Sequence, residues 1–319
     1  MSGSRRSSFL ASSTPRPGRG LRIVRTLAQS PSSTVYELVD GRAQRFALKL
    51  VAGPDGAEAV RRFEAEASAL RRVDSPYVVR VFDAFVRPGP IYALLEPLLV
   101  GPTLEAELAR LGRLRPTVAR RILLELLEGL EAIHRAGLVH REVCAENVIL
   151  GREAGDPLFE ERAMLIDLGL ALPHGEGPTP GHIRCKPSGV SPEQILSGRL
   201  DARTDVYAAG ALLHELLTGA PPFAEQSVAA TLAAHLDRLP PLPGASDPSL
   251  AVFDGVIDTA LAKRPDRRYA SAADFARALC ALELGPDAPA AGPAPRPAPR
   301  SAQDGCSQRG LREAVELGA

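Results

Sequence analysis

Apolar residues follow a strand-like spacing in the first third of the folded part of this chain. The runs LRIVRTLAQ, STVYELVD and RFALKLV have strand-like composition, with Gly or Asp at the breaks. The segment GAEAVRRFEAEASALRRV carries apolar residues at helical spacing and ends before DSPY. The runs VVRVFDAFVR and IYALLEPLLV then return to strand character. The pattern predicts a group of strands around one helix.

The rest of the folded part has mostly helical spacing. Its clearest helices are TVARRILLELLEGLEAIHRAG, TDVYAAGALLHELLTGA and SAADFARALCALEL. Because the strands come first and the helices follow, we expect a mixed α+β fold with two lobes and not an alternating parallel sheet.

Local composition gives the expected domain bounds. Residues 1–20 are rich in Ser, Arg, Pro and Gly, and residues 285–319 are rich in Pro and Ala. Both segments are predicted to be disordered tails. The folded part between them divides into a small lobe at 21–98 and a larger helical lobe at 99–284.

Charge and cysteine content narrow the class of protein. The 38 basic and 38 acidic residues balance, so no basic surface indicates nucleic acid as a partner. No apolar run is long enough for a membrane span, and the N-terminal residues do not resemble a secretory signal. The 4 cysteines lack metal-ligand spacing. We expect a reduced, cytoplasmic protein, and the sequence leaves its oligomeric state open.

The order of motifs in the folded part resembles that of bacterial eukaryotic-like Ser/Thr protein kinases. The motifs are FALK, EAEASAL, VHREVCAENVIL, LIDLGLA, SPEQILSG, TDVYAAG and RPDRRY. The resemblance covers the whole folded region. It implies the bilobal protein kinase fold, with a β-rich N-lobe and a helical C-lobe, ATP and Mg²⁺ as cofactors, and a protein hydroxyl as the phosphate acceptor.

The resemblance also implies roles for individual residues. Lys49 would hold the nucleotide phosphates, and Glu66 would pair with Lys49. Asn147 and Asp167 would bind Mg²⁺ through oxygen atoms. Glu142 stands where the family has the Asp that accepts the proton of the substrate hydroxyl.

Further implied residues surround the base of the nucleotide. Leu95 would be the gatekeeper behind the adenine, and the C=O of Glu96 and the N–H of Leu98 would meet the adenine edge. The other positions implied to contact the nucleotide are Ala28, Ser30, Ser33, Val35, Ala47 and Ile149.

Three residues have implied structural roles in the larger lobe. Glu193 would form a salt bridge with Arg268, and Asp205 would bind the backbone of the catalytic loop. These features favour a protein kinase over a small-molecule phosphotransferase.

Two departures from the family pattern predict reduced activity. Ala28, Ser30 and Ser33 replace the glycines of the phosphate-binding loop, and each added Cβ restricts the approach of the backbone to phosphate. Glu142 is one methylene longer than Asp, which extends its reach by roughly 1.5 Å. A misplacement of about 1 Å costs around 10²-fold in rate.

A third departure lies beside the second. Cys144 replaces the usual Lys of the catalytic loop, and Lys186 stands where the family has Thr. Our hypothesis is that Lys186 reaches back to the vacated space and partly restores the charge. Cys144 and Cys185 either form a regulatory disulfide or stay reduced and serve only as small packing residues.

A phosphorylation site is a further hypothesis. A phosphate on Thr179 would pair with Arg141 and order the segment around it. The alternative is an unregulated loop rich in Gly and Pro.

Three functions therefore stay open after the sequence alone. The first is a Ser/Thr protein kinase of reduced activity that uses MgATP. The second is a pseudokinase, a nucleotide-responsive binding module that signals to a partner. The third and weakest is a small-molecule phosphotransferase.

Overall fold

The computed structural model describes most of the folded part of the chain. The described residues are 20–29, 33–52, 57–87, 91–154, 161–167, 172–175 and 186–285. The side chains of 52, 57–59, 62, 65, 66, 87, 91, 172 and 173 are outside this description. The predicted tails, 1–20 and 285–319, lie outside it except for Gly20 and Gly285.

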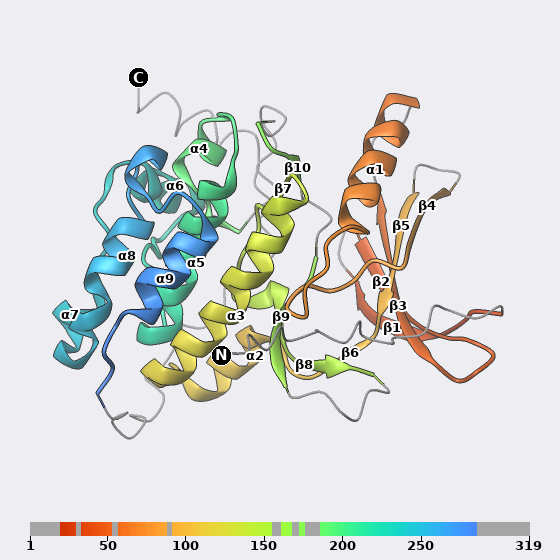
Figure 1. The fold of residues 1–319 in the computed structure, drawn as a ribbon, viewed down its shortest axis with the longest axis horizontal. Coiled ribbons are helices and arrows are strands. Elements are labelled where there is room, and N and C mark those ends of the chain that lie inside the picture. The colour runs from red at the N-terminus through yellow and green to blue at the C-terminus, as the bar shows by residue number, and fades with distance from the viewer. Residues whose placement is uncertain are drawn as a thin grey trace, which may run out of the picture.

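An antiparallel sheet forms the N-terminal part of the molecule (Figure 1). Its strands lie in the order β1-β2-β3-β5-β4. One helix, α1 (Ala57–Leu70), packs beside them, and the ring of Phe63 lies 4.6 Å from that of Tyr92. The strand bounds are β1 Arg22–Gln29, β2 Ser33–Val39, β3 Arg45–Ala52, β4 Asp83–Arg87 and β5 Ile91–Pro97.

Helices dominate the C-terminal part, as the hydrophobic pattern predicts. They surround one large core, to which α3 and α5 contribute fully buried residues such as Leu126, Ile133 and Leu213. The helix bounds are α2 Leu104–Leu111, α3 Pro116–Arg135, α4 Pro192–Ile195, α5 Ala202–Thr218, α6 Val228–Asp237, α7 Pro243–Ser246, α8 Asp254–Ala260 and α9 Ala272–Cys280. The α+β prediction is confirmed.

Short strands and 3₁₀ turns lie between and beside the helices. One small sheet has the order β6-β8-β9, and a second pairs β10 with β7. The bounds of the strands are β6 Leu99–Val100, β7 Leu138–Val139, β8 Val148–Glu153, β9 Arg162–Leu165 and β10 Leu172–Pro173. The 3₁₀ turns are η1 Ala145–Asn147, η3 Pro187–Gly189, η4 Pro248–Phe253 and η5 Pro265–Arg267.

Local sequence explains the bounds of the two central helices. Helix α3 begins at Pro116, where a missing N–H costs nothing because the first turn of a helix has no partner for it. Helix α5 begins after Asp201, whose side chain accepts a hydrogen bond from the N–H of Arg203. It ends at Gly219, which has φ 84° and so takes the left-handed conformation that glycine tolerates.

Backbone contacts join the sheet to the helical part. The segment after α1 was predicted as a long strand, but only Asp83–Arg87 of it forms one. Before that, the N–H of Val79 donates to the C=O of Leu165 at 2.8 Å, and the N–H of Leu165 donates to the C=O of Tyr77 at 2.8 Å. This segment therefore pairs with β9 and connects the large sheet to the helical part.

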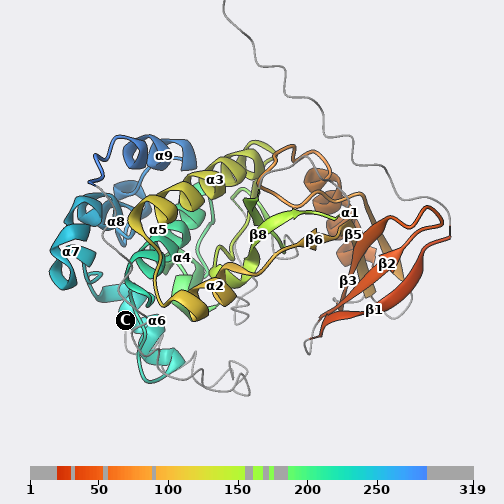
Figure 2. The ribbon, with the colours of Figure 1, turned by 90° about the horizontal axis from the view of Figure 1, so that it is seen from below.

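A second connection runs through β6 and β8, which lie between the two parts in Figure 2. Gly101 crosses β8 closely: a Cβ added there would lie 2.1 Å from the carbonyl oxygen of Leu150. The C=O of Leu98 accepts a hydrogen bond from the N–H of Ala154 at 2.7 Å. The chain that leaves β5 is thus held against β8.

Within the described residues, the helices are too short or too polar to cross a membrane.

Candidate active site

The loop between β7 and η1 is anchored from below by one buried carboxylate. Asp205 of α5 accepts hydrogen bonds from the N–H groups of His140 and Arg141, both at 2.8 Å, and from Nε2 of His134 at 2.7 Å. Burial favours the neutral acid, but these hydrogen bonds hold the pKa of Asp205 below its ordinary value. The anchor therefore stays ionised, as the role implied for Asp205 requires. Arg141 takes φ 74° in this loop.

Glu142 follows directly in the loop and is half-buried. Nδ2 of Asn147 donates to the backbone C=O of Glu142 at 3.1 Å, which closes the turn. Burial raises the pKa of Glu142 to about 7, and the negative charge of Asp167 adds to the rise. A hydrogen bond with Asn147 and the charges of Lys49 and Lys186 oppose it. Glu142 is thus a carboxyl group that changes its charge near neutral pH.

Lys49 and Asp167 connect the sheet to this loop. Lys49 is buried on β3, and its Nζ forms an ion pair with Oδ1 of Asp167. Asp167 lies just after β9 and has φ 64°. The preceding residue, Ile166, donates its N–H to the C=O of Asn147 at 2.9 Å. Lys49, Glu142, Asn147 and Asp167 therefore converge on one place from separate elements.

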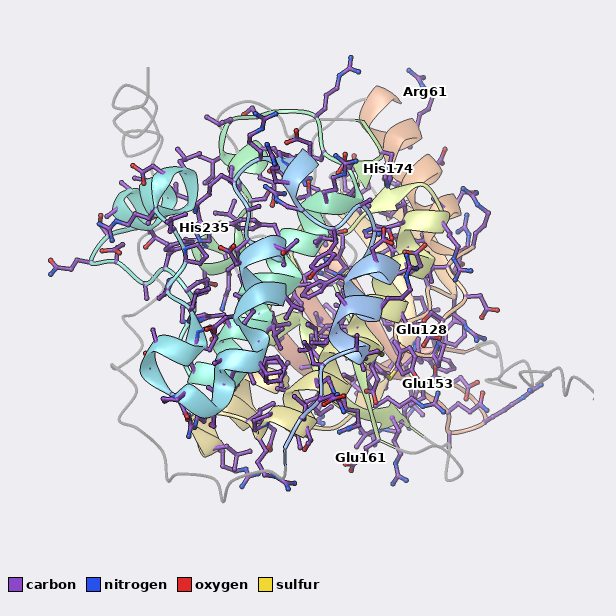
Figure 3. All side chains as sticks on the ribbon, turned by 60° about the vertical axis from the view of Figure 1, so that its left-hand side comes forward. Arg61, Glu128, Glu153, Glu161, His174 and His235 are labelled. Atoms are coloured by element: carbon purple, nitrogen blue, oxygen red, sulfur yellow. The ribbon has the colours of Figure 1, made fainter. Side chains whose placement is uncertain are left out.

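A buried ion pair supports α4, which follows Asp167 in the chain. Nη1 and Nη2 of Arg268 donate to the two carboxylate oxygens of Glu193 at 2.7 and 2.8 Å, as the resemblance implies. The hydroxyl of Thr204 donates to the same carboxylate at 3.0 Å. The Arg268 guanidinium lies over the ring of Tyr207, whose hydroxyl is 2.8 Å from Nδ1 of His235. Figure 3 labels His235, which lies on α6.

Sequence reasoning missed one contact, which joins α4 to the loop between β7 and η1. Nε2 of Gln194 donates to the backbone C=O of Arg141 at 3.0 Å. Gln194 also completes a capping box with Ser191 at the start of α4. The signal was present, because Ser-x-x-Gln before a helix is a capping-box pattern.

Lys186 lies beside the catalytic loop. Its Nζ forms an ion pair with Glu146 and lies 3.7 Å from Oε1 of Glu105. Its charge lowers the pKa values of Glu142 and Cys144, which places the amine within electrostatic reach of both. The two acidic partners had no signal in the sequence. That Lys186 replaces the missing lysine stays a prediction.

Cys144 is a buried free thiol. Burial, to which the negative charge of Glu142 adds, raises its pKa to about 12. A thiol that stays protonated is a poor nucleophile, which favours the reading as a reduced filler. Cys185, Thr179 and Ser30 lie outside the described residues, as does the side chain of Glu66. The disulfide, the phosphorylation and the Lys49–Glu66 pair stay predictions.

Strand pairing sets which side chains share a face of the large sheet. Directly paired residues of antiparallel strands point to the same side, and neighbours along a strand point to opposite sides. The register pairs Lys49 with Val35 and Leu94, and Ala47 with Glu96. These five side chains therefore share one face.

Leu95 lies on the other face of the sheet. Its side chain belongs to a separate apolar cluster with Leu38 and Phe46. Glu96 therefore shares the face of Ala47 and Lys49, while Leu95 does not. The placement of Leu95 behind the base stays a prediction. The motif alone could not supply this strand register.

The remaining described positions implied for the nucleotide lie on three strands and on the link between β5 and β6. Ala28 of β1 pairs with Val35 of β2, and Ser33 begins β2. Ile149 of β8 pairs with Met164 of β9. Leu98 is buried, between β5 and β6.

Comparisons with known proteins agree with this geometry. A family model described as "Protein kinase domain" matches residues 21–281. "Serine/threonine-protein kinase Pkn1" of Myxococcus xanthus is 36% identical over 226 residues, which are 70% of this chain and 32% of that protein. "Serine/threonine-protein kinase PknL" of Mycobacterium tuberculosis is 35% identical over 254 residues, 77% of this chain and 61% of that protein. "Serine/threonine-protein kinase PkaA" of Streptomyces coelicolor is 37% identical over 225 residues, 70% and 40%. The chain thus spans between 32% and 61% of these relatives.

Proposed function

The chain belongs to the protein kinase domain family, and from that premise we propose that it is a serine/threonine kinase. In this proposal it transfers the γ-phosphoryl group of MgATP to a hydroxyl group of a protein. The observation that carries the proposal is the convergence of Lys49, Glu142, Asn147 and Asp167. The relatives named above, each called a serine/threonine-protein kinase, support it.

The charges of the site suit phosphoryl transfer. A transferring phosphoryl group spreads negative charge over its oxygens, so catalysis depends on positioning and on positive charge nearby. Lys49 is buried on β3 and paired with Asp167. The low dielectric there strengthens the attraction of its charge for phosphate. We propose that Lys49 holds the nucleotide phosphates.

The oxygen atoms of Asn147 and Asp167 suit Mg²⁺ that is also bound by phosphates. They suit less well a metal that is held by protein ligands alone. Asn147 uses its Nδ2 in the turn, which leaves its amide oxygen for a ligand, and Asp167 offers a carboxylate. Among the described residues, no group of three or more His, Cys, Asp or Glu side chains could hold a metal. Mg²⁺ accepts few protein oxygens when phosphates supply the rest. When bound, it would neutralise charge on the phosphates.

Glu142 is the proposed general base. Its pKa of about 7 lets it take a proton from the substrate hydroxyl near neutral pH. In the proposed step the hydroxyl oxygen bonds to the γ-phosphorus, its proton passes to the Glu142 carboxylate, and the bond to the leaving ADP oxygen breaks. The longer side chain and the altered phosphate loop would keep the rate low.

A binding module without transfer is the second candidate. It is favoured by Cys144, whose buried neutral thiol gives the catalytic loop no positive charge. In that case the chain would bind nucleotide and signal to a partner. The proposal also includes the binding of a nucleotide, a protein substrate or partner, and a cytoplasmic location.

Autophosphorylation with radiolabelled ATP separates the candidates. The kinase proposal expects incorporation by the wild type and its loss in Asp167→Asn. No incorporation, together with an ATP-dependent rise in Tm, supports the binding module. If ATP gives neither result, both candidates fail.

A further inference from the structure

Gln194 joins two parts of the structure through the two ends of its side-chain amide. The residue is 2% exposed and lies on α4. Its Oε1 accepts hydrogen bonds from the backbone N–H and from the hydroxyl of Ser191, both at 3.1 Å. Its Nε2 donates to the backbone C=O of Arg141, 53 residues earlier in the chain, at 3.0 Å. One buried amide thus ties α4 to the loop between β7 and η1.

The partners of this amide fix its orientation. A backbone N–H can only donate, so the amide oxygen must face Ser191. A backbone C=O can only accept, so the amide nitrogen must face Arg141. The capping box of α4 uses Oε1 and the backbone N–H of Gln194, and it does not use Nε2. The contact with Arg141 is therefore a second use of the side chain, which the start of α4 does not require.

Arg141 has a backbone conformation that needs support from its surroundings. Its φ of 74° lies in the left-handed region, which is unfavourable for a residue with a Cβ. Such a conformation persists when neighbouring groups hold it from several sides. The N–H of Arg141 donates to Oδ1 of Asp205 at 2.8 Å, and its C=O accepts from Gln194. Gln194 thus supplies the contact on the side that leads to Glu142.

The peptide between Arg141 and Glu142 sets the direction in which the Glu142 side chain leaves the loop. Its C=O bonds to Gln194, and its N–H donates to Nδ1 of His140 at 3.3 Å. Burial lowers the pKa of His140, so the ring is neutral and Nδ1 can accept. The C=O of Glu142 itself accepts from Nδ2 of Asn147. Since a peptide unit is planar and rigid, these bonds on both of its edges keep it from rotating.

Resting on the proposed function, in which Glu142 is the general base, we propose that Gln194 is a positioning residue for Glu142. It holds the carbonyl of the preceding peptide and so keeps the Glu142 carboxyl directed at the acceptor hydroxyl. Without this donor the buried carbonyl is unsatisfied, and the peptide rotates toward another partner. The rate of transfer then falls, while the nucleotide is still bound by groups on the other side of the site.

A role for Gln194 in the stability of α4 alone makes a different prediction. In that case the loss of any comparable hydrogen bond at this helix would have the same effect. Thr204 offers the comparison, because its buried hydroxyl donates to Glu193 of α4 at 3.0 Å. Thr204→Val removes that bond, keeps the shape of the side chain and leaves the contact between Gln194 and Arg141 in place.

The test compares Thr204→Val with two variants that lack the donor. Gln194→Glu keeps the acceptor of the capping box, because Gln and Glu both serve at that position. The donors of Ser191 favour its ionised form at about pH 8, and an ionised carboxylate cannot donate. Gln194→Met removes the donor without adding a charge, and it covers a Gln194→Glu chain that does not fold. Each full chain is assayed for autophosphorylation over a range of MgATP concentrations.

We expect both Gln194 variants to lose roughly 10- to 100-fold in rate at saturating MgATP, as a small misplacement of a catalytic group does. The MgATP concentration at half-maximal rate should stay the same, and Thr204→Val should keep the wild-type rate. An equal loss of rate in Thr204→Val, or a wild-type rate in the Gln194 variants, overturns the proposal.

Amide hydrogen exchange tests the positioning without any phosphoryl transfer. Mass spectrometry of the full chain without nucleotide follows the segment from Val139 to Asn147. Its exchange should be about 2- to 10-fold faster in Gln194→Met, the change expected for one lost hydrogen bond, and unchanged in Thr204→Val. Wild-type exchange in Gln194→Met overturns the proposal. Faster exchange in a protein whose wild type incorporates no phosphate overturns the proposed function instead, and leaves Gln194 as a residue that only orders the loop.

Discussion

Arg268 binds Glu193 across 75 residues of sequence through two hydrogen bonds of 2.7 and 2.8 Å. Arg268 also donates to the backbone C=O groups of Ala262, Arg203 and Lys263. One guanidinium thus ties α4, which contains Glu193, to α5 and to the turn before η5. The planar fork of arginine matches a carboxylate in a way that a lysine cannot.

The first prediction concerns this ion pair. Arg268→Ala should lower the free energy of unfolding by about 3–5 kcal/mol, because it leaves Glu193 as an unpaired buried charge. Urea unfolding followed by circular dichroism measures the change. The matched control is Arg264→Ala, which breaks an exposed pair with Asp266 and should leave the free energy of unfolding nearly unchanged. Equal losses in the two variants would contradict the structural role of Arg268.

The second prediction is a pH dependence. The pKa of Glu142 is raised from 4.5 to about 7, so the carboxyl is protonated below about pH 7 and cannot accept a proton. At saturating MgATP, kcat should fall about tenfold per pH unit below that value and level off above it. Saturation separates this effect from nucleotide binding. A flat profile between about pH 6 and about pH 8 would remove Glu142 as the general base.

The third prediction tests the reach of Glu142. Glu142→Asp shortens the side chain by one methylene and should raise kcat by up to about 10²-fold if misplacement limits the rate. The KM for ATP should stay unchanged, since the substitution lies on the acceptor side. Glu161→Asp, an exposed residue outside the site, is the control. A fall in kcat would show that the structure has adapted to glutamate.

The fourth prediction concerns Lys186. Its charge lowers the pKa of Glu142, so Lys186→Ala should move the inflection of the kcat–pH profile to higher pH. At about pH 7 the rate should drop a few-fold, while Lys186→Arg keeps the charge and the wild-type inflection. Rate loss without a shift of the inflection would indicate that Lys186 only supports the fold through Glu146 and Glu105.

Periodicity and motif order were sufficient for most of the fold. The strand runs and the helical segments that became α3, α5 and α9 follow from alternating and 3.6-residue spacing, which are local properties. The prediction of a strand was wrong for the segment from Val78 to Val81. Its apolar residues are buried where the segment pairs with β9, and not within the large sheet. Apolar composition does not distinguish these two environments.

The amino-acid sequence by itself determined the order of elements, the family resemblance and the charged residues available to the site. The tertiary structure alone decided which of them meet. Strand register put Glu96 and not Leu95 on the face of Ala47 and Lys49, because a shift of one residue reverses every side chain. Burial and neighbouring charges set the pKa values of Glu96 and Glu142 near 7. These properties depend on distances across the fold, and local sequence carries no measure of them.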